Sequence, residues 1–292
     1  MEFVNAKTII QTVKGNHSWF GASYNMNIYR GCNQGCIYCD SRSNCYQVHN
    51  FDKVKAKRNA PILIENELKS KKNKGVISMG SMSDPYNAFE EKLEYTKQAL
   101  SSIHKYNFGV FIITKSILVL RDKQILSEIN KKNVVNIAIT ITTANDLLQS
   151  RIERNVSSSS QRFLALKELA EKGLFTGILL MPILPFINDT VDNISKIIDL
   201  AYEANVKYIY PSFGVTLRDN QRDYFLDKIG AELRNKYINT FKDNYMCRSK
   251  NIDELKATFT KKCDEYGILY KMEDIINESN KYVKEEQLAL FQ

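Results

Sequence analysis

The sequence lacks any run of about 18 consecutive apolar residues, which a membrane-spanning helix needs. Residues 1–16 also lack the basic stretch followed by an apolar stretch that marks a secretory signal. Internal repeats and low-complexity tracts are absent. Cysteine is scarce, with 6 in 292 residues, and half of the cysteines fall in one short segment. This distribution favours a metal site in a reducing compartment over a disulfide framework. We therefore expect a cytoplasmic protein with no membrane segment.

The remaining composition is that of a globular protein with a sizeable core. Hydrophobic residues make up 43% of the chain and charged residues 25%. The net charge is +8, but it is unevenly distributed. Residues 1–75 contain 12 Lys and Arg against 5 Asp and Glu, a net charge of +7. A basic surface in this part of the chain would favour a partner that carries phosphate, and a solvated lysine-rich helix is the alternative.

Strand patterns alternate with helix patterns six times between residues 24 and 211. The expected strands are 24–28, 76–79, 110–114, 134–142, 175–181 and 207–211, and the expected helices are about 60–72, 89–105, 121–131, 161–171 and one that Asp189 caps. Such alternation predicts right-handed βαβ units and a parallel sheet. Six units predict an α/β fold of the partial (β/α)6 TIM-type barrel class. We divide the chain into an N-terminal segment, 1–23, that packs on the core through Trp19 and Phe20, the barrel, 24–214, and a helical C-terminal extension, 215–292.

The most distinctive segment is YRGCNQGCIYCD, where Cys32, Cys36 and Cys39 follow one another in a C-x3-C-x2-C pattern. Thiolates are the ligands of iron-sulfur clusters. Three ligands leave one iron of a 4Fe-4S cubane open for a small molecule. A structural zinc site with Cys45 as its fourth ligand is the alternative interpretation.

The cysteine spacing, with Tyr38 before the last cysteine, resembles the cluster motif of the radical S-adenosylmethionine (SAM) enzymes. The resemblance implies a 4Fe-4S cluster held by the three cysteines, SAM bound at the open iron, cleavage of SAM to a 5'-deoxyadenosyl radical, and an electron donor of the flavodoxin or ferredoxin type. In a parallel α/β barrel, ligands bind at the C-terminal ends of the strands.

Unusual residues stand at those strand ends. Lys115 follows the third strand and is a candidate for the SAM carboxylate, and Thr140 and Thr142 on the fourth strand are candidates for the ribose hydroxyls. We expect Asn136, Ala138 and the two threonines to share the face that lines the barrel interior, where small polar side chains would suit a polar ligand. After the second strand, Gly80 permits close approach of a ligand and Asp84 can accept a hydrogen bond from an ammonium group.

The segments GSMSDPY, ITKS and MPILPFIND, with the region around Glu153 and Arg162, resemble the spore photoproduct lyase branch of the radical SAM proteins. This resemblance implies that Tyr38, Ser83, Asp84 and Lys115 contact SAM and that the substrate is a lesion in DNA. One residue departs from the pattern, because Ser81 stands where those lyases have the cysteine that returns a hydrogen atom. Either another residue, such as Tyr86, Cys45 or Tyr210, supplies the hydrogen, or the substrate differs.

Two further segments could contribute to the site or bind a partner. The segment from Thr216 to Phe225, with Arg218, Arg222 and Tyr224, could close the site or bind phosphate, and surface packing is the alternative. The terminal segment Gln287 to Phe291 resembles the QLxLF peptide with which bacterial repair proteins bind the sliding clamp. The leading hypothesis is a radical SAM enzyme acting on nucleic acid. The alternatives are a radical SAM enzyme acting on RNA, protein or a metabolite, and a zinc-stabilised nucleic-acid-binding module without turnover.

Overall fold

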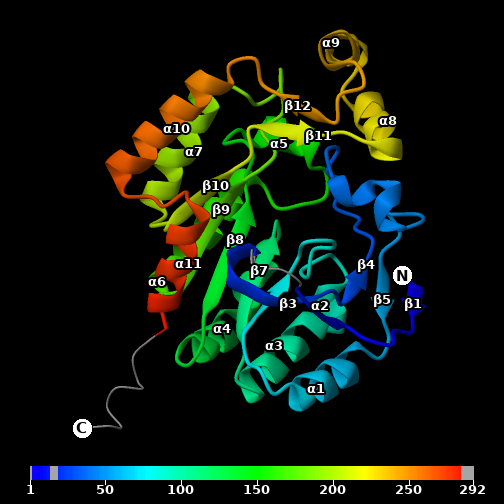
Figure 1. The fold of residues 1–292 in the computed structure, drawn as a ribbon, viewed down its shortest axis with the longest axis vertical. Coiled ribbons are helices and arrows are strands. Elements are labelled where there is room, and N and C mark those ends of the chain that lie inside the picture. Colours follow the sequence, from blue (N-terminus) through cyan, green and yellow to red (C-terminus); the bar gives the residue numbers. More distant parts are fainter. Residues whose placement is uncertain (1, 14–18, 284–292) are drawn as a thin grey trace.

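The computed structural model describes residues 2–13 and 19–283. Its main sheet has six parallel strands in sequence order and a seventh, antiparallel strand at one edge (Figure 1). The parallel strands are β3 (Ala22–Met26), β6 (Val76–Met79), β7 (Gly109–Thr114), β8 (Val135–Thr140), β9 (Phe175–Leu180) and β10 (Tyr208–Pro211), and the antiparallel strand is β2 (Ile10–Thr12). Each of the six predicted strands is present with ends within two residues of those expected. The predicted partial barrel is confirmed.

Helices follow the strands and cover the outer face of the sheet (Figure 1). They are α1 (Ala60–Ser70), α2 (Glu90–Leu93), α3 (Tyr95–Lys105), α4 (Lys123–Asn130), α5 (Asp146–Ile152), α6 (Ser159–Glu171) and α7 (Val191–Glu203). The single helix predicted over 89–105 is broken, because Glu94 adopts a left-handed conformation with φ 50°. The first turn predicted from residue 121 belongs instead to a 3-10 helix, Ile117–Asp122. Helix α5 was not predicted.

The start of α7 also differs from the expectation. Thr190, rather than Asp189, is the N-cap, and its side chain accepts a hydrogen bond from the amide of Asn193. The Asp189 carboxylate instead accepts from the hydroxyl of Ser249, at 2.6 Å, in the C-terminal extension. Either side chain type can cap a helix, so the sequence alone left a one-residue ambiguity.

Two hydrophobic layers lie on opposite faces of the barrel sheet. Ile137, Ile139 and Ile141 pack outward under the helices, as the period of two predicts. The opposite face is filled by aromatic side chains, namely Phe20, Phe111, Phe175 and Tyr208. The rings of Phe20 and Phe111 stack with centroids 4.5 Å apart.

This aromatic layer corrects the prediction of a polar barrel interior. Asn136 does not face a ligand space; its Oδ1 accepts a hydrogen bond of 2.7 Å from the hydroxyl of Tyr208. Ala138 packs within the same aromatic layer. Among the four residues predicted to line the interior, Thr140 alone borders a cavity that also contains the cysteines, in the part of the chain that the structure describes. Phe20, from the N-terminal segment, belongs to this aromatic layer, and its side chain is only 2% exposed. The described part of the N-terminal segment thus contributes Phe20 to the barrel core.

A second, three-stranded sheet was not predicted. It consists of β1 (Glu2–Val4), β5 (Lys55–Lys57) and β4 (Tyr29–Arg30), in the order β1-β5-β4. The sheet lies at the edge of the molecule next to the segment that enters the cysteine motif (Figure 1). It thereby joins the N-terminus to the entrance of the candidate site.

The C-terminal extension contributes the hairpin β11 (Gly214–Thr216) and β12 (Met246–Arg248), and helices α8 (Asp219–Lys228), α9 (Ala231–Phe241), α10 (Ile252–Tyr266) and α11 (Met272–Lys281). Leu269 pairs with Tyr208 at the outer edge of β10, and Ile275 of α11 joins the aromatic layer of the barrel. The extension thus covers the open side of the partial barrel. None of the described helices is long and apolar enough to cross a membrane.

Candidate functional site

The three clustered cysteines lie on a loop that two backbone contacts fix. Gly31, with φ +78°, precedes the loop, and a Cβ at this position would lie 2.6 Å from the carbonyl oxygen of Phe51. The Cys32 amide donates to that same oxygen at 2.8 Å. Further along, Cys36 forms an isolated β-bridge with Glu153. The first and second cysteines are therefore anchored to different parts of the fold.

Cys32, Cys36 and Cys39 line one cavity of about 100 Å³, which we call the cysteine cavity. Other residues that line it are Gly80, Ser81, Ser83, Asp84, Thr114, Lys115 and Thr140, all at or near the C-terminal ends of β6, β7 and β8. This is the end of a parallel barrel at which ligands bind. The structure thus brings together the three predicted cluster ligands and most of the predicted SAM contacts.

The donor set of this cavity fits an iron-sulfur cluster. Burial raises the pKa of all three thiols, that of Cys32 to about 12. A thiol loses its proton when it binds metal, so loading releases protons and gives buried thiolates a positive partner. The same cavity is lined by three thiols and by Lys115, so a cluster ligand set and a positive charge for a further ligand lie together. Among the described residues, no group of three or more His, Cys, Asp or Glu side chains has the geometry of a single-ion site.

Cys45 lies apart from the other three. It is exposed, on the 3-10 helix Asn44–Tyr46, and its amide donates to the Ser43 hydroxyl at 3.3 Å. It lines neither the cysteine cavity nor the larger cavity described below. The four-cysteine zinc site is therefore not formed in this structure, and the predicted catalytic role of Cys45 has no support from its position.

The Asp84 carboxylate, at the wall of the cysteine cavity, accepts four hydrogen bonds. Its Oδ1 accepts from the Thr114 hydroxyl at 2.7 Å and from the Tyr86 amide at 2.8 Å. Its Oδ2 accepts from the Gln34 side chain at 2.6 Å and from the Lys115 amide at 2.8 Å. An ammonium group would have to share or replace one of these donors. The geometry therefore assigns Asp84 a positioning role, because it ties the cysteine loop to the ends of β6 and β7. Sequence reasoning missed Gln34 and Thr114, its two side-chain partners.

Ser83 and Gly80 also shape the cavity wall. The Ser83 hydroxyl donates to the carbonyl of Gly31 at 2.5 Å, which links β6 to the cysteine loop. Gly80 has φ +101°, and a Cβ there would lie 2.0 Å from the carbonyl oxygen of Ile113. Only glycine fits this close approach of two strands.

Lys115 stands at the mouth of the barrel without an ion-pair partner within 4.0 Å among the described residues. Its ammonium lies 5.8 Å from the centroid of the Tyr38 ring. Burial by itself would lower the pKa of Lys115, but the nearby Cys36, Glu153 and Cys39 outweigh burial and the net pKa shift is upward. The side chain is thus a retained positive charge in a confined space, which suits an anionic ligand.

A buried ion pair between Glu153 and Arg162 contacts the cysteine loop through Tyr38. Arg162 and Glu153 are both 0% exposed, and their side chains meet at 2.6 Å. The Tyr38 hydroxyl donates to the other oxygen of the Glu153 carboxylate. Arg162 also donates to the carbonyl of Thr140 at 2.9 Å. Tyr38 and the end of β8 are therefore held by the same pair of charges.

The two strand-four threonines differ in position. Thr140 lines the cysteine cavity. Thr142 is 1% exposed and lines neither that cavity nor the larger one. Its carbonyl oxygen accepts from the side chains of Asn188, at 2.8 Å, and Asn193, at 3.1 Å. The structure does not bring Thr142 to the place where it was expected to bind ribose.

Next to the cysteine cavity is a larger one of about 460 Å³, which we call the mouth cavity. Lys115, Ser81 and Cys39 line both cavities, so the two are neighbours. The outer wall of the mouth cavity comes from Trp19, Met181 and Tyr245, together with Gly214, Val215 and Thr216 of β11. Trp19 is 37% exposed and Tyr245 49% exposed. Sequence reasoning missed Tyr245, which precedes a strand of only three residues and carries no motif.

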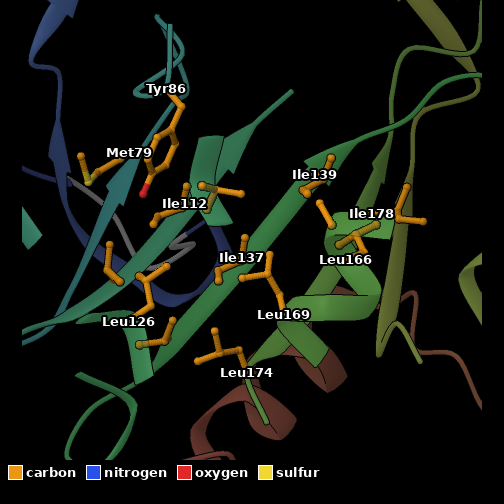
Figure 2. Packing of buried hydrophobic residues seen from close by; sticks show 14 of the residues in the cluster. Met79, Tyr86, Ile112, Leu126, Ile137, Ile139, Leu166, Leu169, Leu174 and Ile178 are labelled. Carbon is orange, nitrogen blue, oxygen red and sulfur yellow. The ribbon is translucent and has the colours of Figure 1, made fainter. Parts of the chain in front are cut away.

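Tyr86 is not at either cavity. It is 2% exposed and belongs to the main hydrophobic core, and Figure 2 shows its ring among core side chains that include Met79 and Ile112. The other proposed hydrogen donor, Tyr210, packs edge-on against Trp19 with centroids 5.2 Å apart. Among the three predicted catalytic residues, the described structure brings Ser81 alone to the cavities.

The segment after β11 packs against the cysteine loop. Arg218 forms an ion pair of 2.6 Å with Asp40, the residue that follows Cys39, and the Thr216 hydroxyl donates to the same carboxylate at 3.1 Å. The guanidinium of Arg42 lies 3.7 Å from the centroid of the Tyr224 ring. Of this segment Thr216 lines the mouth cavity, and the carboxylate of Asp40 already pairs with Arg218. Whether the segment closes the site or binds phosphate stays a prediction.

Comparison with known proteins agrees with this geometry. An uncharacterized protein of Methanocaldococcus jannaschii is 29% identical over 259 residues, which cover 87% of this chain and 88% of that protein. An uncharacterized protein of Mycobacterium tuberculosis is 23% identical over 210 residues, which cover 70% of this chain and 62% of that protein. A structure of spore photoproduct lyase complexed with dinucleoside spore photoproduct superimposes with a TM-score of 0.66 at 14% identity, covering 91% of this chain and 80% of that chain.

The last similarity confirms the partial-barrel fold. The model of the radical SAM superfamily matches residues 26–213, which include the three cysteines and all six parallel strands except the first four residues of β3. That range is more than half of the chain. The protein therefore belongs to the radical SAM superfamily.

Proposed function

We propose that the protein is a radical SAM enzyme that abstracts a hydrogen atom from a nucleic-acid substrate, with a lesion in DNA as the first candidate. The observation that carries the proposal is the pair of neighbouring cavities. One contains three thiols, of which those of Cys32 and Cys36 are buried and that of Cys39 is half-buried, and the other extends beside it to partly exposed aromatic side chains. A small cofactor space next to a larger substrate space is the arrangement that such a reaction requires.

The residues of the first cavity would hold the cofactors. Cys32, Cys36 and Cys39 would bind a 4Fe-4S cluster, which in this superfamily supplies the electron that cleaves SAM to a 5'-deoxyadenosyl radical. Lys115 would bind the SAM carboxylate, since its positive charge has no ion-pair partner in the described structure. Gly80 leaves room beside the cofactor. Tyr38, which lines the mouth cavity, would exclude water from the reacting atoms.

The mouth cavity supports a nucleic-acid substrate. Its volume of about 460 Å³ lies within the range of small-molecule sites, roughly 300–1,000 Å³. Trp19 and Tyr245 line the cavity and are partly exposed, and exposed aromatic rings can stack with bases. The structurally similar spore photoproduct lyase was determined in complex with a dinucleoside photoproduct. Two bases of one strand would thus be a suitable occupant.

Ser81 sets a limit on the similarity to the lyases. It lines both cavities, but a serine O–H bond is too strong to donate a hydrogen atom easily. Neither Cys45 nor Tyr86 lines these cavities. This observation favours the second candidate function, a radical SAM reaction that needs no hydrogen returned by the protein. Its substrate would be RNA, a protein or a metabolite.

Two further partners belong to the proposal. The reaction needs a one-electron reductant, and a flavodoxin- or ferredoxin-type protein would supply it. The terminal segment Gln287 to Phe291 would bind a sliding clamp. This segment lies outside the described residues, and deletion of residues 287–292 should abolish clamp binding while SAM cleavage continues.

The decisive experiment measures 5'-deoxyadenosine release by anaerobically purified protein with SAM and a chemical reductant. We expect UV-irradiated DNA to raise the rate above the uncoupled rate, and unirradiated DNA and RNA to raise it less. The Cys36→Ala variant should lose both the brown colour of the cluster and all release. If no nucleic acid changes the rate of the wild-type protein, the nucleic-acid substrate is wrong and the second candidate function takes its place.

A further inference from the structure

A groove of about 390 Å³ lies on the N-terminal sheet, away from the two cavities. Its walls are the segment 4–8 after β1, the segment 47–49, and residues of β4 and β5. It shares no lining residue with the cysteine cavity or the mouth cavity. The cationic residues that line it are Lys7, Arg30, Lys53, Lys55 and Lys57, and no Asp or Glu lines it. We call this site the basic groove.

The charges of the basic groove are only partly compensated. Lys55 pairs with Glu2 at 3.2 Å, and Glu2 is itself exposed. Among the described residues, Arg30 donates to the backbone carbonyl of Gln47 and Lys57 to that of Asn27, and neither has a carboxylate at ion-pair distance. Lys7 and Lys53 are exposed and, within the described ranges, have no carboxylate at ion-pair distance. A groove with this excess of positive charge attracts anions.

Lys57 shows that the positive charges are close enough to oppose one another. Its pKa is lowered, first by burial and then by the positive charge of Arg30. Mutual repulsion between clustered cations destabilises the folded protein, and an anion that binds among them removes this destabilisation. The electrostatics of the groove therefore suit a ligand with several negative charges rather than one.

The spacing of the cations suits a chain of phosphates. Lys55 and Lys57 lie on one face of β5, while Ala56 between them is buried on the other. Two residues of a strand span about 6.8 Å, so the two ammonium groups can contact different phosphates of one nucleic-acid strand.

The groove also adjoins the cluster loop. The segment that carries Lys53 provides the Phe51 carbonyl that accepts from the Cys32 amide. Arg30 stands two residues before Cys32 on the same strand and loop. A polymer held in the basic groove would therefore pass close to the loop that forms the cysteine cavity.

We infer that the basic groove binds the phosphate backbone of a nucleic acid outside the mouth cavity. The inference rests on the proposed function for the choice of a nucleic acid over an acidic protein, and the concave shape and strand-like cation spacing support the same choice. The groove would supply affinity without base recognition, since phosphate contacts carry no sequence information. Much of the +7 charge of residues 1–75 would then have a function, rather than belonging to a solvated helix.

The test compares two variants with equal loss of charge. The groove variant carries Lys7→Gln, Lys53→Gln and Lys55→Gln. The control variant carries Lys69→Gln, Lys72→Gln and Lys92→Gln, three exposed lysines that do not line the groove. Anaerobic, cluster-loaded protein is titrated into a fluorescent, lesion-free oligodeoxynucleotide of about 16 nucleotides at several salt concentrations. Melting temperatures and iron contents of both variants are measured in parallel.

The salt dependence gives the expected magnitude. Each lost phosphate contact should reduce the slope of log affinity against log salt by about 0.7 for a single strand. Three lost contacts should lower the slope by about 2 and weaken binding roughly 100-fold at 0.1 M salt. The control variant should bind within about 3-fold of the wild-type protein, a difference that one weak surface contact would produce.

Each possible result either supports or overturns binding of nucleic acid in the basic groove. Equal weakening in both variants would overturn the groove and leave a general charge effect. Unchanged binding by the groove variant, with slower reduction by an acidic flavodoxin-type protein, would reassign the groove to a protein partner. A third result is possible: the groove variant loses binding, but nucleic acid does not stimulate SAM cleavage by the wild-type protein. This result would support the basic groove and refute only the proposed reaction.

Discussion

The Glu153–Arg162 pair offers the sharpest test of how the cysteine loop is supported. Both side chains are 0% exposed, and the Tyr38 hydroxyl donates to the same carboxylate. Removing one member of a buried pair leaves the other charge unpaired, at a typical cost of about 3–5 kcal/mol. We expect Glu153→Ala to lower the free energy of unfolding by about this amount. The melting temperature should fall by roughly 6–20 °C at 2–4 °C per kcal/mol.

The assay is thermal unfolding of anaerobic, cluster-loaded protein, followed by circular dichroism, with iron content measured on the same samples. Asp227→Ala is the matched control, because it removes the carboxylate of an exposed pair with Arg234 and should cost less than about 1 kcal/mol. Replacing both buried charges by apolar residues, Glu153→Leu with Arg162→Met, should recover most of the stability. It should not recover full iron content, since Tyr38 would still lack its acceptor.

The reasoning is refuted if Glu153→Ala melts within about 2 °C of the wild-type protein, the shift expected for less than 1 kcal/mol. It is also refuted if the double replacement restores both stability and iron. The second result would mean that Tyr38 and the loop are positioned without the hydrogen bond to the carboxylate.

Three other predictions concern separate parts of the fold. Gly80→Ala should destabilise the protein by more than 2 kcal/mol and prevent SAM binding in equilibrium dialysis, because the added Cβ would collide with the carbonyl of Ile113. Gly267→Ala is the control: with φ +67° in the left-handed helical region and no atom within 4 Å it should cost only about 1 kcal/mol, and equal costs would refute the clash. Phe20→Ala should cost about 3–5 kcal/mol in chemical unfolding, since it empties the centre of the barrel's aromatic layer, and a loss below 1 kcal/mol would contradict that packing. In the cluster-loaded protein at pH 8, a thiol reagent should label the exposed Cys45 quickly and the buried Cys247 and Cys263 slowly, and mass spectrometry showing a rapid label on either of the latter two would contradict their burial.

The sequence predicted the barrel well because each barrel strand combines apolar residues with a clear break on either side. Strand β6 was predicted with its observed ends, and α6 to within two residues. The N-terminal sheet could not be predicted, since its strands have two or three residues and Glu2 pairs with Lys55 far along the chain. The break at Glu94 was missed because a non-glycine residue in the left-handed region gives no sequence signal.

The sequence predicted the type of site and its position in the fold, but not the contacts between its side chains. A motif identifies the cysteines, and their position at the strand ends followed from the topology. Side-chain orientation did not follow: the period of two placed Asn136 and Thr140 on one face correctly, but Tyr208 fills that face at the depth of Asn136. Asp84 lines the cysteine cavity, and the four protein donors that surround its carboxylate could not be read from the sequence. Such contacts between distant segments are set by tertiary packing.

The mouth cavity draws its outer wall from the two ends of the chain, with Trp19 before the barrel and Tyr245 after it. The wall nearest the thiols comes from the barrel itself. Under the proposed function, the side chains that select the substrate and those that hold the cluster are therefore encoded in different stretches of the gene, and the flanking stretches could diverge among relatives while the cluster residues are kept. Grafting the flanking segments of one relative onto the barrel of another is a direct way to exchange substrates.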